Sequence, residues 1–245
     1  MSIEAVFFDA GETLLSPNPS WSELAVVKLE ERGHDVTVDR MRLAWRHVGD
    51  HFIDAADAGI MFSVSHDASK RFWTKLYLDQ LEFLGIDDEG AALVLYETFS
   101  NPANYRLFDD SLPTVAALKE RGVRVGIISN FESWLRDMLT HFDMLDLFEV
   151  VAISGELELE KPDPRIFEWA LREMGTTPDV SLYVGDSPNF DAQPAHDLGM
   201  TGVLLDRHGR WTDLDAPYPV VSTLAELLPL IDGTSPRRGS GTAPQ

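Results

Sequence analysis

The chain has 245 residues, a net charge of −21 and no cysteine. So acidic a chain argues against nucleic acid and anionic membranes as partners, but a small anionic substrate stays open because a divalent cation can reverse the field locally. The lack of cysteine excludes disulfides, thiolate metal sites and a cysteine nucleophile. With no secretory signal and no apolar run long enough for a membrane span, we expect a cytoplasmic protein.

The first predicted element is a short buried strand that ends at a carboxylate. An apolar run from Ala5 to Phe8 precedes Asp9, and Gly11 follows as a turn signal. In open parallel α/β sheets, ligands bind at the carboxyl ends of the strands. A buried charge there costs free energy unless it is paired or bound to a metal, so Asp9 is a candidate functional residue.

Residues 17–105 predict an all-helical segment. Ser20 and Glu23 have the spacing of a capping box at its start. Apolar residues then recur at helical spacing, as they do within 41–52, and no convincing strand pattern interrupts them. A helical block is therefore expected directly after the first strand and its turn.

From about Leu107 onward, the pattern alternates between strands and helices. Strands are predicted over 123–130, 148–153, 181–186 and 201–205, and helices over 113–121, 134–142, 164–174, 192–198 and 224–231. This alternation predicts an α/β fold with a doubly wound parallel sheet and right-handed crossovers. The polar, Gly- and Pro-rich residues 235–245 are expected to form a disordered tail.

Chemically useful side chains collect where the predicted strands end. These are Asp9, Ser129, Asn130 and Asp186, joined by Asp191 and by Lys161 in a Pro-rigid loop. A carboxylate can act as nucleophile and form an acyl-phosphate, while hydroxyl, amide and Lys groups hold phosphoryl oxygens. Two or three carboxylates can hold Mg²⁺, so the set suits phosphoryl transfer. The acidic residues just before Lys161 are expected to form a solvated loop: Glu156, Glu158 and Glu160.

Four short motifs, taken in order, resemble those of the haloacid dehalogenase-like (HAD) hydrolases. They are Asp9-Ala10-Gly11-Glu12-Thr13, Ser129-Asn130, Lys161-Pro162, and Gly185-Asp186-Ser187 followed by Asp191. The resemblance covers nearly the whole chain and looks closest to the branch of animal HAD-domain hydrolases of poorly defined substrate. It implies a HAD-like Rossmannoid core over 1–16 and 106–234, with an inserted helical cap of the C1 type over 17–105.

The resemblance also implies a role for each motif residue. Asp9 would be the nucleophile, and Lys161 would neutralise charge on Asp9 and on the phosphoryl group. Phosphate would be held by Ser129, the backbone of Asn130 and Lys161, with Thr13 steadying the first loop. Mg²⁺ would be bound by Asp9, the backbone carbonyl of Gly11 and Asp186, with Asp191 binding directly or through water. The implied function is a Mg²⁺-dependent phosphatase of a phosphorylated small molecule, working through an aspartyl-phosphate as a monomer or homodimer.

One position departs from the family pattern. Family phosphatases usually carry a second Asp two residues after the nucleophile, which protonates the leaving group and later activates water; here that residue is Gly11. General acid–base help is worth roughly a hundred- to ten-thousand-fold in rate. Three accounts stay open: a slow phosphatase or one that uses good leaving groups, Glu12 as a substitute, or a reaction other than phosphate-ester hydrolysis.

The last account leaves three alternative functions. Haloacid dehalogenases also lack the second Asp, but they generally lack the Gly-Asp pair seen here as Gly185-Asp186. Phosphonate hydrolases place a small residue at this position and use a cap lysine as a Schiff base, for which the candidates are Lys28, Lys70 and Lys75. A catalytically weak binding or regulatory protein is the third.

Overall fold

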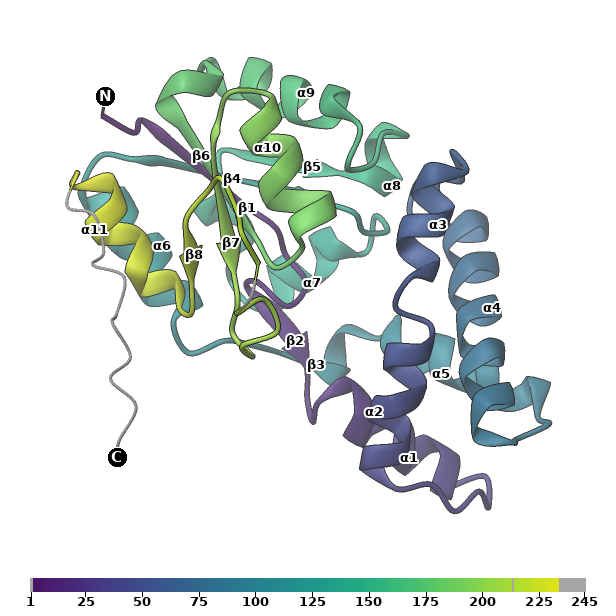
Figure 1. Ribbon diagram of the computed structural model, residues 1–245. Helices are drawn as coiled ribbons and strands as arrows, with labels where there is room; N and C mark the ends of the chain where they lie inside the picture. Colours follow the sequence, from purple (N-terminus) through teal and green to yellow (C-terminus); the bar gives the residue numbers. More distant parts are fainter. Residues whose placement is uncertain (1, 213, 234–245) are drawn as a thin grey trace.

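A central sheet of six parallel strands organises the protein (Figure 1). The computed structural model describes residues 2–212 and 214–233. The strand order is β5-β4-β1-β6-β7-β8. Their bounds are β1 (Ala5–Phe8), β4 (Arg124–Ser129), β5 (Val150–Ile153), β6 (Ser181–Gly185), β7 (Thr201–Leu205) and β8 (Val220–Val221). The predicted α/β class with a parallel sheet is confirmed, and β8, a two-residue strand too short to leave a pattern, is an addition to it.

Alternation along β1 divides the core between the two faces of the sheet. Val6 and Phe8 pack in one cluster, and Ala5 and Phe7 in another, because successive side chains of a strand point to opposite faces. The first cluster is covered by α6 (Ser111–Glu120), α7 (Leu135–His141) and α11 (Leu227–Ile231), and the second by α9 (Pro164–Met174) and α10 (Gln193–Asp197). The sheet is therefore wound on both sides.

The helix α9 shows how local sequence sets these boundaries. Asp163 caps its start by accepting a hydrogen bond from the backbone N–H of Arg165 at 2.9 Å. Pro164 occupies the first turn, where a missing N–H costs nothing. Gly175 ends the helix at φ 66°, a conformation that glycine adopts without strain. Both predicted ends of this helix are confirmed.

The remaining short elements lie at the ends of strands and helices. The helix α8 (Ser154–Leu157) follows β5, and a π-helical turn η4 (Pro188–Ala192) precedes α10. Four 3₁₀ turns are η1 (Pro102–Asn104), η2 (Leu145–Leu147), η3 (Pro178–Val180) and η5 (Leu224–Glu226). The tail expected over 235–245 lies outside the described residues.

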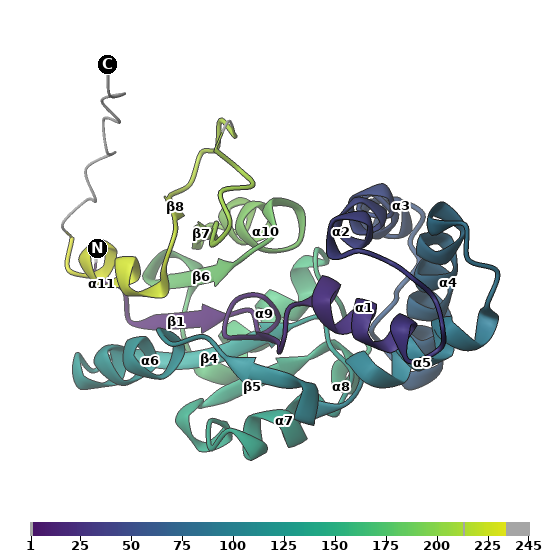
Figure 2. The same ribbon diagram turned by 90° about the horizontal axis from the view of Figure 1, so that it is seen from below.

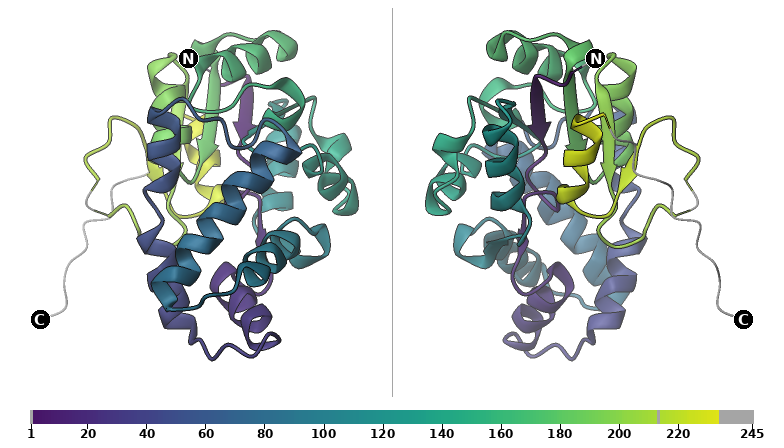
Figure 3. Two further views of the ribbon diagram at one scale, coloured as in Figure 1. Left: turned by 90° about the vertical axis from the view of Figure 1, so that its right-hand side faces the viewer. Right: turned by 90° about the vertical axis from the view of Figure 1, so that its left-hand side faces the viewer.

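Five helices stand at the end of the core toward which β1 points (Figure 2), and they lie in front of it in the left view of Figure 3. They are α1 (Trp21–Glu30), α2 (Val38–His47), α3 (His51–Asp57), α4 (His66–Leu84) and α5 (Glu89–Phe99). The expected capping box is present, since the Glu23 carboxylate accepts a hydrogen bond from the Ser20 backbone N–H at 3.1 Å. The helices pack around their own apolar cluster, which includes Leu29, Met41 and Leu95.

Among the described helices, none has the length and apolarity that a membrane span requires.

A two-stranded antiparallel ribbon connects these helices to the core. It consists of β2 (Leu15–Pro17) and β3 (Tyr105–Leu107). Pro17 pairs with Tyr105, so the two expected limits of the helical segment face each other across this ribbon. Strands of three residues fall below the length at which alternation can be recognised, which is why the sequence does not indicate them.

Candidate active site

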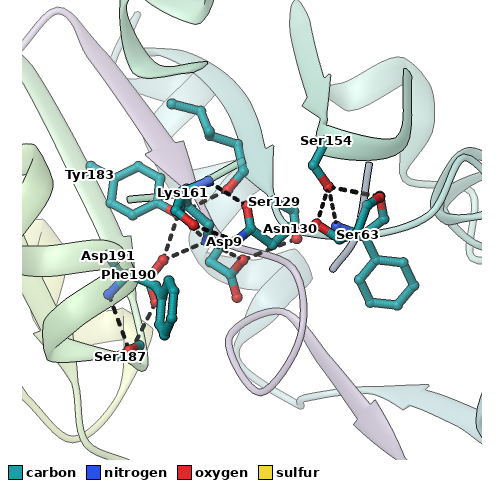
Figure 4. Close-up of polar contacts among 12 residues, drawn as sticks. Asp9, Ser63, Ser129, Asn130, Ser154, Lys161, Tyr183, Ser187, Phe190 and Asp191 are labelled. Atoms are coloured by element: carbon teal, nitrogen blue, oxygen red, sulfur yellow. Dashed lines mark hydrogen bonds and ion pairs between the residues drawn. The ribbon is translucent and has the colours of Figure 1, made fainter. Parts of the chain in front are cut away.

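The sheet brings the predicted motif residues together at one edge (Figure 4). Asp9 directly follows β1, Ser129 ends β4, and Asp186 directly follows β6. From β1 the chain adds β4 and then β5 on one side of β1, and it then adds β6, β7 and β8 on the other side. The direction of winding therefore reverses between β1 and β6. Such a switch point is the place where α/β sheets bind ligands.

Lys161 lies at the centre of the site with its charge fully engaged. Its Nζ atom is 2.8 Å from Oδ1 of Asp9, 2.5 Å from Oδ1 of Asp191 and 2.9 Å from the hydroxyl of Tyr183. Although burial alone would lower it, the carboxylates of Asp191 and Asp9 hold the pKa of Lys161 above its usual range. The ammonium therefore stays charged, and its three N–H donors all have partners.

Asp9 is a buried carboxylate held in one orientation. Besides Lys161, the hydroxyl of Ser129 donates a 3.0 Å hydrogen bond to the same Oδ1 atom. Burial and the negative charge of Asp191 raise the pKa of Asp9, while Lys161 and Ser129 oppose the rise. These two donors leave Oδ2 as the atom of Asp9 without a fixed hydrogen bond among the contacts described here, so the carboxylate is oriented but not saturated.

The side chain of Asn130 binds the backbone of Lys161. Its Nδ2 donates to the carbonyl of Lys161 at 2.8 Å, and its Oδ1 accepts from the backbone N–H of Lys161 at 2.7 Å. This paired contact joins the loop after β4 to the loop that carries Lys161. Both polar atoms of the Asn130 side chain are therefore engaged, which leaves its backbone as the group expected to contact a phosphate.

Three carboxylates converge where a cation would be expected. One oxygen each of Asp9, Asp186 and Asp191 lies within 4.8 Å of the others. Gly185 permits this approach, because a Cβ atom at that position would collide with the carboxylate of Asp191. The backbone N–H of Ser187 donates to Oδ2 of Asp191 at 2.9 Å and holds it in place.

Burial and the convergence of the three carboxylates raise the pKa of Asp186. Burial, together with the charges of Asp191 and Asp9, raises the pKa of Asp186 to about 7. Arg210 compensates in part, with Nη2 2.8 Å from Oδ2 of Asp186. The site therefore holds more negative charge than its own cations balance, which is typical of a site that binds a divalent cation.

Replacing Asp186 by asparagine is expected to make the stability of the metal-free protein less dependent on pH. Because the folded pKa is near 7 and the usual value is 3.8, the folded chain keeps a proton on Asp186 that the unfolded chain has lost, and stability falls as pH rises from about 4 through 7. Asp186→Asn removes this loss. At pH 8 the variant should gain on the order of 2 kcal/mol over the wild type, less than the full shift implies because the Asp186 side chain is 22% exposed.

Urea unfolding in EDTA at pH 4 and pH 8 measures this difference. The two proteins should be nearly equal at pH 4 and separate at pH 8, and added Mg²⁺ should stabilise the wild type alone. A constant difference at both pH values would contradict the assignment of the raised pKa to Asp186.

In the first motif, Gly11 leaves open space in the cavity, and the carboxylate of Glu12 points elsewhere. Gly11 lines the cavity, and a Cβ atom there would meet only Cε2 of Phe131, at 3.9 Å. The carboxylate of Glu12 instead accepts a 2.8 Å hydrogen bond from Nε1 of Trp21 and is absent from the residues that line the cavity. Thr13 is fully buried and lies outside this lining as well, with its backbone carbonyl bound by Arg207. In this conformation the Glu12 carboxylate does not take the place of an acid–base group in the cavity.

A cavity of about 230 Å³ opens above Asp9 and Lys161, between the sheet and the five helices. Its floor carries the motif residues, and its walls are rich in aromatic side chains from both sides. Trp21, Trp73 and Phe99 come from the helices, whereas Phe131 comes from the loop after β4 and Phe190 from η4. The volume is enough for a small organic ester rather than for a macromolecule.

Two buried glutamates connect the helices to the loops that carry the motifs. Glu132, three residues after Ser129, accepts hydrogen bonds from Ser69 Oγ at 2.7 Å, His66 Nδ1 at 2.9 Å and Tyr96 hydroxyl at 3.1 Å. Its identity as a connector could not be inferred from the sequence, because its partners are 36 to 66 residues away.

Glu160 corrects the expectation of a solvated acidic loop. It is only 6% exposed, and its carboxylate accepts hydrogen bonds from the backbone N–H groups of Phe62 and Ser63 and from the Ser63 hydroxyl, at 2.7 to 3.0 Å. The acidic sequence before Lys161 does not indicate which glutamate will accept hydrogen bonds from the backbone of a distant segment. Because Glu160 directly precedes Lys161, this contact also fixes the loop that positions the lysine.

Tyr183 is a further site residue that the sequence analysis missed. Its hydroxyl accepts from Lys161 and lies 2.9 Å from both Oδ1 of Asp191 and the carbonyl of Ile128. A signal was available, because a tyrosine inside a strand that reads as buried needs a polar partner for its hydroxyl.

The lysines considered for a Schiff base do not reach the cavity. Lys28 pairs with Glu31 at 2.9 Å, Lys75 pairs with Asp79, and the Nζ atom of Lys70 lies 5.9 Å from the ring centre of Tyr96. None of the three is among the residues that line the cavity. This geometry does not support a phosphonate hydrolase of the Schiff-base type.

Comparison with known proteins places this site in a family. A family model for haloacid dehalogenase-like hydrolases matches residues 3–199. The mouse haloacid dehalogenase-like hydrolase domain-containing protein 3 is 28% identical over 246 residues, covering 95% of each chain. A phosphoserine phosphatase of Thermus thermophilus is 31% identical over 146 residues, covering 59% of each.

Solved structures share the fold. The putative HAD-hydrolase YfnB from Bacillus subtilis, solved bound to magnesium, superimposes with a TM-score of 0.75 at 17% identity, covering 95% of this chain and 100% of that one. The family model spans all four motifs and the helices between them. The structure brings side chains from these motifs together around Asp9 (Figure 4). The chain therefore belongs to the haloacid dehalogenase-like hydrolases.

Proposed function

We propose that this hydrolase is a Mg²⁺-dependent phosphatase that acts on a phosphorylated small molecule through an aspartyl-phosphate on Asp9. The observation that carries the proposal is the placement of Asp9, a buried carboxylate oriented by Lys161 and Ser129 beside two further carboxylates. The phosphatase name of the Thermus relative is consistent with this chemistry.

The donor set fits Mg²⁺. The converging groups are all carboxylate oxygens, which a hard divalent cation prefers, and the raised pKa of Asp186 reflects charge that such a cation would neutralise. Asp9, Asp186 and Asp191 would hold the ion, together with the backbone carbonyl of Gly11. When bound, Mg²⁺ supplies positive charge for the phosphoryl oxygens and for the carboxylates that hold it.

The protein's own residues would carry out two displacements at phosphorus. In the first, a carboxylate oxygen of Asp9 forms a bond to phosphorus while the bond to the ester oxygen breaks. Lys161 and Ser129 balance the charge that spreads over the phosphoryl oxygens. In the second, water attacks phosphorus and releases Asp9 and inorganic phosphate. With Gly11 at the acid–base position, the ester oxygen of the first displacement would leave as an anion and then take its proton from water.

We further propose that α1–α5 act as the cap over this site, in keeping with the expected boundaries 17–105. The five helices supply much of the cavity wall and pack around a cluster of their own, so they can move as a unit. Glu132 and Glu160 bind the cap to the two core loops that carry Ser129 and Lys161. Closure would exclude water from the floor of the cavity and strengthen the electrostatic interactions there.

Steady-state release of p-nitrophenol from p-nitrophenyl phosphate tests the proposed function. Turnover is expected with Mg²⁺, and EDTA should reduce it at least about a hundred-fold, because the uncompensated carboxylates would repel the phosphoryl group. Re-adding Mg²⁺ should restore the rate. Undiminished turnover in EDTA would contradict the metal dependence, and turnover of a 2-haloacid in place of the phosphate ester would favour the dehalogenase alternative.

A further inference from the structure

The walls of the cavity above Asp9 differ sharply from its floor. Nearly half of the lining residues are aromatic, and several pack directly against one another. The rings of Trp21 and Phe99 have centroids 4.3 Å apart, and the planes of Trp21 and Trp73 are within 8° of parallel at 6.2 Å. On the core side, Phe131 meets Trp134 edge-on at 4.7 Å. Such mutually packed rings offer a rigid, flat and apolar surface.

The walls contain no cation that is free to bind a second anionic group. Lys161 is the sole Lys or Arg among the lining residues in the described part of the chain, and its three donors are used by Asp9, Asp191 and Tyr183. The carboxylate of Glu132, in the core loop after β4, also lines the cavity and would repel an anion. A leaving group with a carboxylate or second phosphate would therefore lose its hydration without gaining a partner.

The same carboxylate is not open to a cationic leaving group either. Glu132 already accepts hydrogen bonds from Ser69, His66 and Tyr96. An ammonium group would have to displace these contacts, which also join the cap to the core. An uncharged leaving group is the one that the walls can bury without breaking an existing interaction.

The floor independently favours a leaving group that departs without protonation. Gly11 has no side chain to donate a proton, and Glu12 is bound to Trp21 outside the lining. A phenol has a pKa of about 10, as in tyrosine, whereas aliphatic alcohols are far weaker acids, with pKa values close to that of water. A phenolate is thus a far better unassisted leaving group than an alkoxide.

We propose that the cavity selects phosphate monoesters of uncharged aromatic alcohols, with the ring packed between the aromatic walls and the phosphoryl group at Asp9. This inference rests on the proposed phosphatase function and names its substrate class. Two independent features agree on it: the aromatic walls without a free cation, and the missing acid–base residue at Gly11.

The first arm of the test varies charge at nearly constant leaving-group reactivity. Phenyl phosphate and 3-carboxyphenyl phosphate release phenols of similar pKa, but only the second carries an extra carboxylate. We expect kcat/KM to be at least about tenfold higher for phenyl phosphate, and both to exceed phosphocholine and phosphoglycolate. Equal or better turnover of the carboxylated ester, or of phosphocholine, would overturn the proposal.

The second arm varies the wall. Trp73→Leu should lower kcat/KM for 1-naphthyl phosphate about tenfold, since a lost aromatic contact and its buried area are worth about 1.4 kcal/mol. Acetyl phosphate has a good leaving group and no ring, so its loss should be much smaller. Trp45→Leu is the matched control, because Trp45 stacks on both Trp21 and Trp73 but is not among the residues that line this cavity.

Acetyl phosphate also separates the two proposals. If it is hydrolysed in a Mg²⁺- and Asp9-dependent manner while aryl esters show no advantage, the substrate class is wrong and the phosphatase stands. If neither acetyl phosphate nor any aryl ester is hydrolysed, both proposals fall. An equal effect of Trp73→Leu on both substrates, or of Trp45→Leu and Trp73→Leu, would also contradict the ring-binding role of the wall.

Discussion

Replacing Asp9 by asparagine is expected to reduce turnover of p-nitrophenyl phosphate by about ten-thousand-fold or more. Losing the attacking group of a catalytic set typically costs this much, because the remaining groups cannot form the covalent intermediate. Asn keeps the shape of the side chain and can still contact Ser129 and Lys161. Since the buried carboxylate of Asp9 has a raised pKa, its removal should not unfold the protein.

Asp163→Asn is the matched control for this substitution. Asp163 lies two residues after the motif residue Lys161, but it caps α9, and asparagine caps helices equally well. The control should keep full activity and an unchanged melting temperature. An Asp9→Asn protein that retained more than about a tenth of wild-type turnover while remaining folded would remove Asp9 from the nucleophile position.

Gly11→Asp should have the largest effect in the opposite direction. It restores a carboxylate at the acid–base position, and such a group is worth roughly a hundred- to ten-thousand-fold. The site has room for it, because the added Cβ would lie 3.9 Å from Phe131 and meets nothing closer. The gain should be greatest for alkyl phosphates, whose leaving groups most need a proton, and small for p-nitrophenyl phosphate.

Gly11→Asn provides the control, since it has the same shape and cannot exchange a proton near neutral pH. If both variants raise the rate equally, a packing or metal effect is responsible rather than acid–base catalysis. If Gly11→Asp leaves the rate for alkyl phosphates unchanged, the missing group does not limit the enzyme. The rates should be measured against leaving-group pKa, where Gly11→Asp is expected to flatten the dependence.

Much of the core could be predicted because its signals are local. The strand at 201–205 and the helix at 164–174 are confirmed to the residue, since turn, cap and glycine signals bracket them. The convergence of Asp9, Ser129 and Asp186 follows from a topological rule, because parallel strands place their carboxyl ends at one edge. The positions of these three residues thus required only the correct strand assignment.

The remaining features depend on contacts between distant segments, which local patterns cannot encode. The burial of Glu160 is decided by the backbone of Phe62 and Ser63, nearly a hundred residues earlier. The direction of Glu12 is decided by the indole of Trp21 and by a backbone with φ 53°. The charge balance at Asp186 includes Arg210, which no motif contains. Each of these three features can be predicted only when the relative positions of two or more segments are known.

The proposed mechanism has a kinetic consequence that makes its intermediate accessible. With Gly11 at the acid–base position, water attack on the proposed aspartyl-phosphate would also be unassisted, so with a good leaving group the first displacement should be faster than the second. An acid quench during turnover of p-nitrophenyl phosphate, followed by mass analysis of the peptide that contains Asp9, tests the central claim most directly. We expect one phosphoryl group on Asp9 in the wild type and none in Asp9→Asn. Steady turnover with an unmodified Asp9, or a phosphoryl group on another residue, would contradict the account.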